Sequence, residues 1–101
     1  MKKKTEVSLS RAHIYYTGRV QGVGFRYESE SLAHKVGGLT GFVKNLPDGR
    51  VELICEGEKK KIEKLLLDIR QSCLGRHIRK TDCNWEAPTN EFDDFTIEFH
   101  L

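Results

Sequence analysis

The order in which hydrophobic periods change along this chain is the feature that most constrains its fold. Segments in which every second residue is apolar indicate strands, at residues 12–20, 39–46, 50–56, 78–85 and 95–101. Segments with apolar residues at helical spacing indicate helices, at residues 25–36 and 58–73. Two helices that each bury one stripe can pack on one face of a single sheet. The order β-α-β-β-α-β plus a C-terminal strand therefore predicts an α+β fold, a ferredoxin-like α/β sandwich with both helices on one face of a mostly antiparallel sheet.

Turn and stop residues mark the ends of several of these elements. Gly37 follows the first helical segment and supplies a left-handed stop. The run Leu-Pro-Asp-Gly at 46–49 predicts a hairpin turn, because proline presets φ and glycine accepts a positive φ. Glu58 is expected at the start of the second helix and Gly75 after its last turn.

The chain has 101 residues, which is the size of one domain. We expect a disordered basic tail at residues 1–10 and a single domain at residues 11–101, present as a monomer. The start methionine and a terminal strand ending at Leu101 favour one complete, free-standing domain. The sequence lacks both an apolar run of about 18 residues, which a membrane span needs, and the apolar stretch of a secretory signal. It therefore predicts a cytoplasmic protein with no membrane partner.

Basic residues gather in two clusters that do not resemble a nucleic-acid-binding surface. Lys2–Lys4 belong to the expected tail, and the lysines at 59–61 and 64 fall on the solvated face of a predicted helix. Recognition of RNA on a sheet also needs a run of exposed stacking aromatics, and the sequence has no such run. We therefore predict no nucleic-acid partner.

The cysteines and histidines do not suggest a metal or redox site. Cys55, Cys73 and Cys83 are odd in number and lack C-x-x-C spacing, and the histidines lack the spacing of metal ligands. Without an export signal, this pattern indicates reduced thiols. Cys55 and Cys73 fall at apolar-patterned positions, so we expect them to be small core residues and not nucleophiles.

The segment Gly-Arg-Val-Gln-Gly-Val-Gly-Phe-Arg, Gly18 to Arg26, carries the strongest chemical signal. It joins a predicted strand to a predicted helix, where glycines allow a tight turn and let successive N–H groups point inward. The helix start adds unpaired N–H donors and the positive end of the helix dipole, so this segment can bind an oxyanion such as phosphate. Arg26 can reach the same anion with a planar, charged guanidinium. On the residues alone, a tight turn with an exposed arginine stays an open alternative, because the spacing matches neither common nucleotide-binding loop.

Asn45 lies where a predicted strand meets the hairpin turn, within Gly-Phe-Val-Lys-Asn-Leu-Pro-Asp-Gly at 41–49. An asparagine in a turn often hydrogen-bonds its own backbone. Its amide can also donate to a bound ligand and accept a hydrogen bond from water. Both interpretations remain open from the residues alone.

Taken together, these two segments resemble the signatures of the acylphosphatase family. Gly18 to Arg26 matches G-x-V-Q-G-V-x-F-R at every fixed position. The stretch from Gly41 to Glu52 matches a second signature, roughly G-x-V-x-N-x-x-D-G-x-V-E. The resemblance extends from about Ile14 to the terminal strand, and Phe42 stands where many members carry tryptophan.

The resemblance implies a small hydrolase, independent of metals and cofactors, that cleaves the mixed anhydride of a carboxylic acid and phosphate. By analogy, Arg26 holds the phosphoryl group and Asn45 positions the attacking water. The phosphate oxygens would be bound by the backbone N–H groups of Gln21, Gly22, Val23, Gly24, Phe25 and Arg26. The ligands it implies are an acyl phosphate as substrate and inorganic phosphate or sulfate as competitors.

Two alternative functions fit the same sequence features. One is a phosphate- or acyl-phosphate-binding module without turnover, because ferredoxin-like sandwiches also host binding functions. The other is a detached acylphosphatase-like domain of a larger maturation enzyme.

Overall fold

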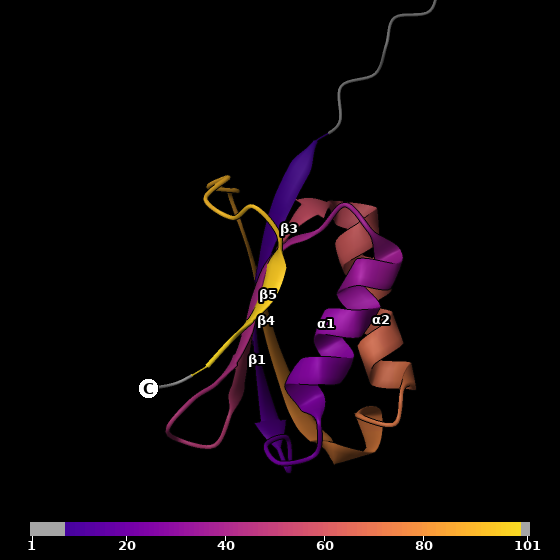
Figure 1. Cartoon of the computed structure of the whole chain (residues 1–101), viewed down its shortest axis with the longest axis vertical. Helices are drawn as coiled ribbons and strands as arrows, with labels where there is room; N and C mark the ends of the chain where they lie inside the picture. The colour runs from indigo at the N-terminus through magenta and orange to yellow at the C-terminus, as the bar shows by residue number, and fades with distance from the viewer. Residues whose placement is uncertain (1–7, 100–101) are drawn as a thin grey trace, which may run out of the picture.

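A five-stranded sheet with two helices on one of its faces makes up the computed structural model, which describes residues 8–99 (Figure 1). The elements are β1 (Leu9–Gly18), α1 (Phe25–Val36), β2 (Thr40–Asn45), β3 (Val51–Glu58), α2 (Lys59–Gln71), the short 3-10 helix η1 (Gly75–His77), β4 (Ile78–Glu86) and β5 (Phe95–Glu98). This order confirms the predicted ferredoxin-like α+β fold. Within the described residues, no helix is long and apolar enough to cross a membrane.

The strand order β4-β1-β3-β2-β5 brings together the parts of the chain that the sequence singled out. Both β1 and β2 run antiparallel to β3, so they are parallel to each other, and β5 is parallel to β2. The C-terminal ends of β1, β2 and β5 therefore lie at one end of the sheet. The loop after β1, the turn after β2 and the end of β5 meet there, at the lower end of Figure 1.

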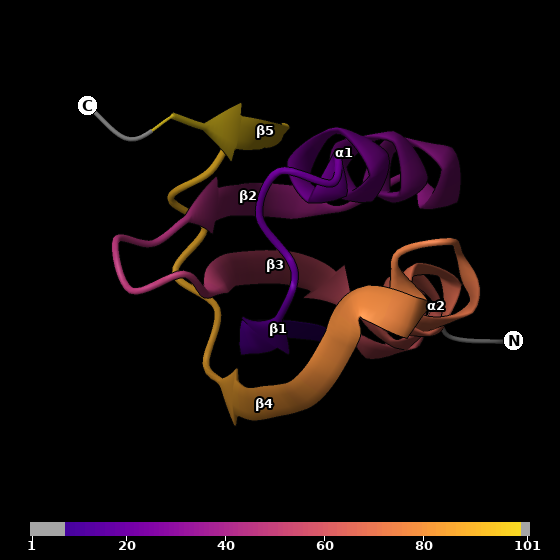
Figure 2. The ribbon, with the colours of Figure 1, turned by 90° about the horizontal axis from the view of Figure 1, so that it is seen from below.

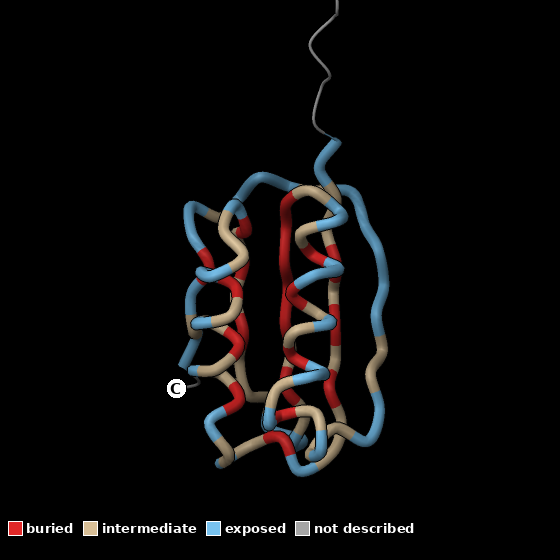
Figure 3. Tube along the Cα trace, turned by 90° about the vertical axis from the view of Figure 1, so that its right-hand side faces the viewer, coloured by how far each residue is buried: buried red, intermediate tan, exposed pale blue. Residues whose placement is uncertain are grey.

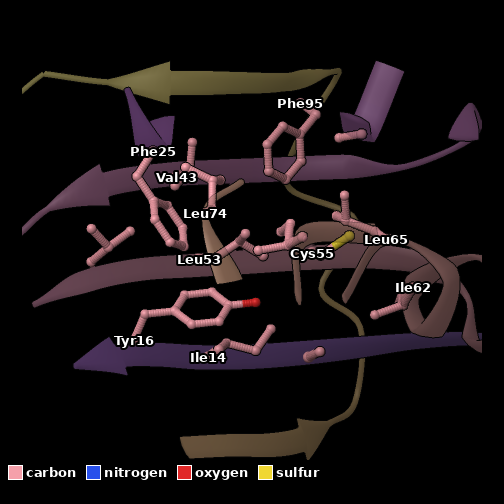
Figure 4. Close-up of a cluster of buried hydrophobic side chains, with 14 of the residues drawn as sticks. Ile14, Tyr16, Phe25, Val43, Leu53, Cys55, Ile62, Leu65, Leu74 and Phe95 are labelled. Atoms are coloured by element: carbon pink, nitrogen blue, oxygen red, sulfur yellow. The ribbon is translucent and has the colours of Figure 1, made fainter. Parts of the chain in front are cut away.

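The core lies between the sheet and the two helices, where the buried segments of both layers face each other (Figure 3). Every second residue of β1 from Ala12 to Tyr16 is buried, as the alternation predicted. The buried residues of the helices share one stripe each: Phe25, Ser29, Ala33, Ile62, Leu65 and Ile69. Figure 4 shows three of these side chains, Phe25, Ile62 and Leu65, close to labelled side chains of β1, β2 and β3.

Phe25 connects the loop after β1 to the core. It is 2% exposed, and its ring centroid lies 4.9 Å from that of Tyr16 (Figure 4). We expect Phe25→Ala to lower the free energy of unfolding by about 3–5 kcal/mol, because it removes a buried aromatic ring and leaves a cavity. That is a large part of the roughly 5–15 kcal/mol typical of a domain.

Urea denaturation monitored by circular dichroism measures this change in the free energy of unfolding. Tyr27→Ala is the matched control, because Tyr27 belongs to the same helical turn but is 61% exposed. Its effect should stay within about 0.5 kcal/mol. An unchanged midpoint for Phe25→Ala would contradict the anchoring role.

Several element ends differ from the sequence predictions. The first strand begins at Leu9 and not at residue 12, because its backbone pairing with β3 continues to the pair Leu9–Glu58. Leu9 and Ser10 thus belong to the strand, and residues 1–7 of the expected tail, with Lys2–Lys4, lie outside the described residues. The last strand ends at Glu98, and Leu101 is likewise outside the described part.

The expectation that Cys73 is a core residue is wrong. Helix α2 ends at Gln71, and the Ser72 hydroxyl donates to the Ile69 carbonyl at 2.7 Å while accepting from the Leu74 N–H at 3.1 Å. This turn places Leu74, 1% exposed, in the core and leaves Cys73 in solvent. Gly75 follows the helix as expected and starts η1.

A buried carboxylate holds the loop between β4 and β5 against the sheet. Glu56 is 3% exposed, pairs with Arg11 at 2.8 Å and accepts the N–H groups of Thr89 and Asn90 at 2.8 and 3.0 Å. Burial by itself raises the pKa of Glu56, but these hydrogen bonds outweigh burial and hold the pKa below its ordinary value. The network therefore fixes the loop that leads into β5.

Candidate active site

Arg26 and Asn45, which belong to different elements, line the same two adjoining pockets at the lower end of the sheet. The larger pocket has a volume of about 370 Å³ and the smaller one of about 190 Å³. The larger is lined by Gln21, Arg26, Asn45, Leu46, Pro47 and Phe99. The smaller is lined by Val20, Gly22, Gly24, Phe25, Arg26, Tyr27 and Asn45. Of the residues expected at the site, only Val23 lines neither pocket; its side chain packs against the core.

The loop between β1 and α1 owes its path to two glycines. Gly22 and Gly24 have φ angles of 78° and 81°, a region that residues with a Cβ atom rarely adopt. Figure 2 shows this loop crossing the end of the sheet from β1 to the start of α1. Gly24 is the last residue before the helix, so the turn delivers the chain directly to the helix N-terminus.

The backbone of this loop presents a row of free donors. Within the described residues, none of the N–H groups from Gln21 to Arg26 donates to a backbone carbonyl, and the first such bond is from Glu28 to Gly24, at 3.0 Å. No side chain caps the N-terminus of α1. Six consecutive donors beside the positive end of a helix dipole suit an anion with several oxygens.

The side chain of Gln21 ties this loop to the turn between β2 and β3. Its amide nitrogen donates to the Leu46 carbonyl at 2.7 Å and to the Arg50 carbonyl at 3.0 Å. The turn has internal bonds of its own, because the Leu46 N–H donates to Arg50 O at 2.8 Å. The backbone N–H of Arg50 donates to Asp48 at 3.0 Å and, with the Arg50 side chain, holds the Asp48 pKa below its ordinary value. Sequence reasoning assigned Gln21 only a backbone role and missed this link.

Arg26 is held by stacking and not by an ion pair. Its guanidinium carbon lies 4.9 Å from the centre of the Phe99 ring, within the range of a cation–π contact. Among the described residues no carboxylate comes within ion-pair distance of Arg26, so its charge is available to an anion. Phe99, just after β5, is 59% exposed and was expected only as part of an alternating strand.

Asn45 is the last residue of β2 and pairs with Val51 across the sheet. Its side-chain oxygen is buried, and no described residue donates a hydrogen bond to it. A buried acceptor without a partner is rare in native proteins and calls for a ligand or a water. The buried oxygen belongs to a residue that lines both pockets together with Arg26, so a partner for it is expected there.

The cysteines take no part in these pockets. Cys55 is buried in the core as expected, and burial raises the pKa of its thiol to about 12, which disfavours the reactive thiolate. Cys73 and Cys83 are exposed and lie elsewhere. In residues 8–99, no three His, Cys, Asp or Glu side chains gather in a group that could hold a metal ion.

Comparisons with known proteins identify relatives of this chain. The family model described as Acylphosphatase matches residues 12–97. An acylphosphatase of Roseiflexus sp. (strain RS-1) is 38% identical over 91 residues, which are 90% of this chain and 97% of the relative. The crystal structure of acylphosphatase from Bacillus subtilis superposes with a TM-score of 0.80 at 30% identity, covering 88% of this chain and 98% of that one.

A third similarity is to part of a larger protein. Full-length HypF, in its phosphate- and nucleotide-bound form, matches with a TM-score of 0.81 at 26% identity, over 95% of this chain but 12% of HypF. These two acylphosphatases, in contrast, are matched over nearly their full length. The family match and the names of these relatives favour neither the binding module nor the maturation-enzyme domain. The chain belongs to the acylphosphatase family, and its activity is the hydrolysis of acyl phosphates to a carboxylate and inorganic phosphate.

Proposed function

We propose that the backbone N–H groups of Gln21 to Arg26 bind the phosphoryl oxygens, that Arg26 neutralises their charge and that Asn45 positions the attacking water. One observation carries this assignment: Arg26 and Asn45 line the same pockets, beside a loop whose donors are free. A cation and a neutral acceptor can thus contact the same bound group. The cation suits the phosphoryl oxygens, and the acceptor suits a water O–H.

The chemistry of an acyl phosphate explains why this site can lack an acid and a base. Phosphoryl transfer passes through a loose transition state, so that positioning and charge stabilisation supply most of the catalysis. The leaving group is a carboxylate with a pKa of about 4, and it departs without needing a proton. The proton of the attacking water can pass to a phosphate oxygen of the substrate. We therefore propose hydrolysis that needs neither a metal nor a cofactor.

An assay of phosphate release from acetyl phosphate and benzoyl phosphate, with a chelator present, tests this mechanism. Turnover should persist in the chelator. A simple phosphate monoester should be hydrolysed far more slowly, because its alkoxide leaving group needs a proton. Loss of turnover in the chelator, or equal rates on ester and anhydride, would contradict the mechanism.

Inorganic phosphate and sulfate are expected to compete with the substrate. Each carries the oxygens that six free N–H donors and Arg26 would bind, so each should occupy the place of the phosphoryl group. Initial rates at several substrate and anion concentrations should show a raised KM at constant kcat. Chloride at equal ionic strength controls for screening. A purely noncompetitive effect would be evidence against the loop as the phosphoryl site.

The Gln21 side chain is expected to act as a positioning group. Gln21→Ala removes both hydrogen bonds between the loop and the turn that follows Asn45, while the backbone N–H of residue 21 remains. We expect kcat/KM to fall by as much as about 10²-fold, the scale for a displacement near 1 Å at a reacting centre.

Gln21→Met separates the hydrogen bonds from the space that the side chain fills. Methionine has a similar length but no donor, so this variant should lose activity as the alanine variant does. Full activity in Gln21→Met would show that the two hydrogen bonds do not position the site. Circular dichroism checks that both variants are folded.

A cytoplasmic location and a monomeric state complete the proposal. The exposed thiols of Cys73 and Cys83 form no disulfide with a described residue, which is typical of a reducing compartment. Size-exclusion chromatography with light scattering tests the monomer, and cell fractionation tests the location.

A further inference from the structure

A second, larger depression adjoins the start of the loop between β1 and α1. Its volume is about 560 Å³, and it is lined by Gly18, Arg19, Arg76, His77 and Arg79. It shares no lining residue with the two pockets around Arg26 and Asn45. We call it the arginine pocket.

Three segments that are distant in sequence meet at the lower end of the molecule (Figure 1), and residues from all three line the arginine pocket. Gly18 ends β1 and Arg19 follows it in the loop, Arg76 and His77 belong to η1, and Arg79 lies at the start of β4. The backbone N–H of Arg19 donates to the His77 carbonyl at 3.0 Å. These segments touch so closely that a Cβ atom on Gly18 would lie 2.2 Å from the same carbonyl oxygen. The backbone segments that carry the lining residues are therefore held against each other.

The charge of this pocket is not compensated. Among the described residues, no carboxylate forms an ion pair with Arg19, Arg76 or Arg79, whereas Arg11 and Arg50 each have such a partner. No acidic residue lines the pocket. A concave surface with charge of one sign concentrates counter-ions, so the pocket attracts anions.

We propose that the arginine pocket binds a small anion that carries two or more phosphate groups. Guanidinium groups bind phosphate oxygens in a two-pronged geometry, and three of them supply more donors than one phosphate group can accept. The pocket is also larger than the 370 Å³ pocket at Arg26. No Phe, Tyr or Trp side chain lines the pocket, and its three guanidinium groups suit phosphate oxygens, so recognition rests on the phosphates.

Tripolyphosphate is the probe, and backbone amide signals in nuclear magnetic resonance spectra report where it binds. Tripolyphosphate can also bind the free N–H groups of the active-site loop, so the titration is repeated with Arg26→Ala. We expect shifts at Arg19 and at residues 76–79 in both proteins, saturating together as one site. Shifts that are confined to residues 21–26 and vanish in Arg26→Ala would overturn the proposal.

Arg76→Gln combined with Arg79→Gln tests the pocket itself. Affinity at this site should fall by about tenfold or more for each arginine, the scale of a lost charge-assisted hydrogen bond. The kcat for acyl phosphate should stay unchanged. Lys35→Gln combined with Lys60→Gln is the matched control, since it removes the same charge from exposed positions on α1 and α2. An equal loss of affinity in the control would mean attraction by net charge alone and would refute a built site.

A nucleotide and an inorganic polyphosphate are the two sources of such an anion, and a nucleoside triphosphate distinguishes between them. If the phosphates alone are recognised, it should bind the arginine pocket about as tightly as tripolyphosphate does. Markedly tighter binding of the nucleotide would contradict recognition through phosphates, and binding as tight for single inorganic phosphate would contradict the need for two or more groups.

Discussion

Arg26→Ala is expected to lower kcat/KM for acyl phosphate hydrolysis by about 10³–10⁵-fold, the range for an arginine that neutralises a transferring phosphoryl group. The loss should appear in both KM and kcat, because the guanidinium meets the phosphoryl charge before and during the reaction. No described carboxylate shares this guanidinium, so its full charge is available in the pocket.

Arg26→Lys separates charge from geometry. Lysine keeps the positive charge, but it loses the planar fork and the stacking on Phe99 that holds Arg26 at 4.9 Å from the ring centre. This variant should therefore also be nearly inactive. Substantial activity in Arg26→Lys would reduce the role of Arg26 to that of a point charge.

Arg19→Ala is the matched control for both variants. Arg19 lies in the same loop but lines the arginine pocket and not the pockets that contain Asn45. Its loss should leave turnover normal. A folded Arg26→Ala enzyme with normal turnover would refute the whole assignment of the site, and circular dichroism supplies the folding check.

Periodicity and turn residues predicted the element order because each element buries one face. The first helix could be placed at 25–36 since glycines stand at both of its ends, and the structure confirms these bounds. Ends without such residues were less predictable. The pairing of Leu9 with Glu58 depends on the backbone of another strand, which an alternation of side chains does not encode.

The proximity of the candidate site residues was predictable where they stand in short, distinctive motifs. Arg26 and Asn45 belong to two segments that lie at one end of the sheet because β1 and β2 both run antiparallel to β3. The role of the Gln21 side chain was not predictable. It donates to main-chain carbonyls 25 and 29 residues away. Every residue has such a carbonyl, so the residue types do not indicate which one accepts a hydrogen bond.

Two further residues were missed for related reasons. Glu56 looks like one more surface carboxylate of a strand, and its burial depends on donors from a loop more than 30 residues further on. Phe99 continues the apolar alternation of Phe95 and Ile97, which predicts a core side chain. The strand ends one residue earlier, so its ring is free to lie against Arg26 instead.

Asn45→Ala is expected to lower kcat by about 10²–10³-fold, the effect of removing one preorganised polar group from a reaction centre. The affinity for inorganic phosphate should survive, because the N–H groups of the loop and Arg26 remain in place. The physical reason is the buried side-chain oxygen of Asn45, which no described residue satisfies. A neutral acceptor there can orient a water without adding charge near the phosphoryl group.

The two variants are therefore separated by a pair of measurements, kcat and the dissociation constant of phosphate. Arg26→Ala should impair both, whereas Asn45→Ala should impair kcat alone. Lys44→Ala controls for strand damage, since neighbouring residues of β2 point to opposite faces and Lys44 lines neither pocket. A folded Asn45→Ala enzyme with unchanged kcat would remove Asn45 from the mechanism. The residue would then only terminate β2 ahead of the turn, and the attacking water would have to be held by the backbone of the loop alone.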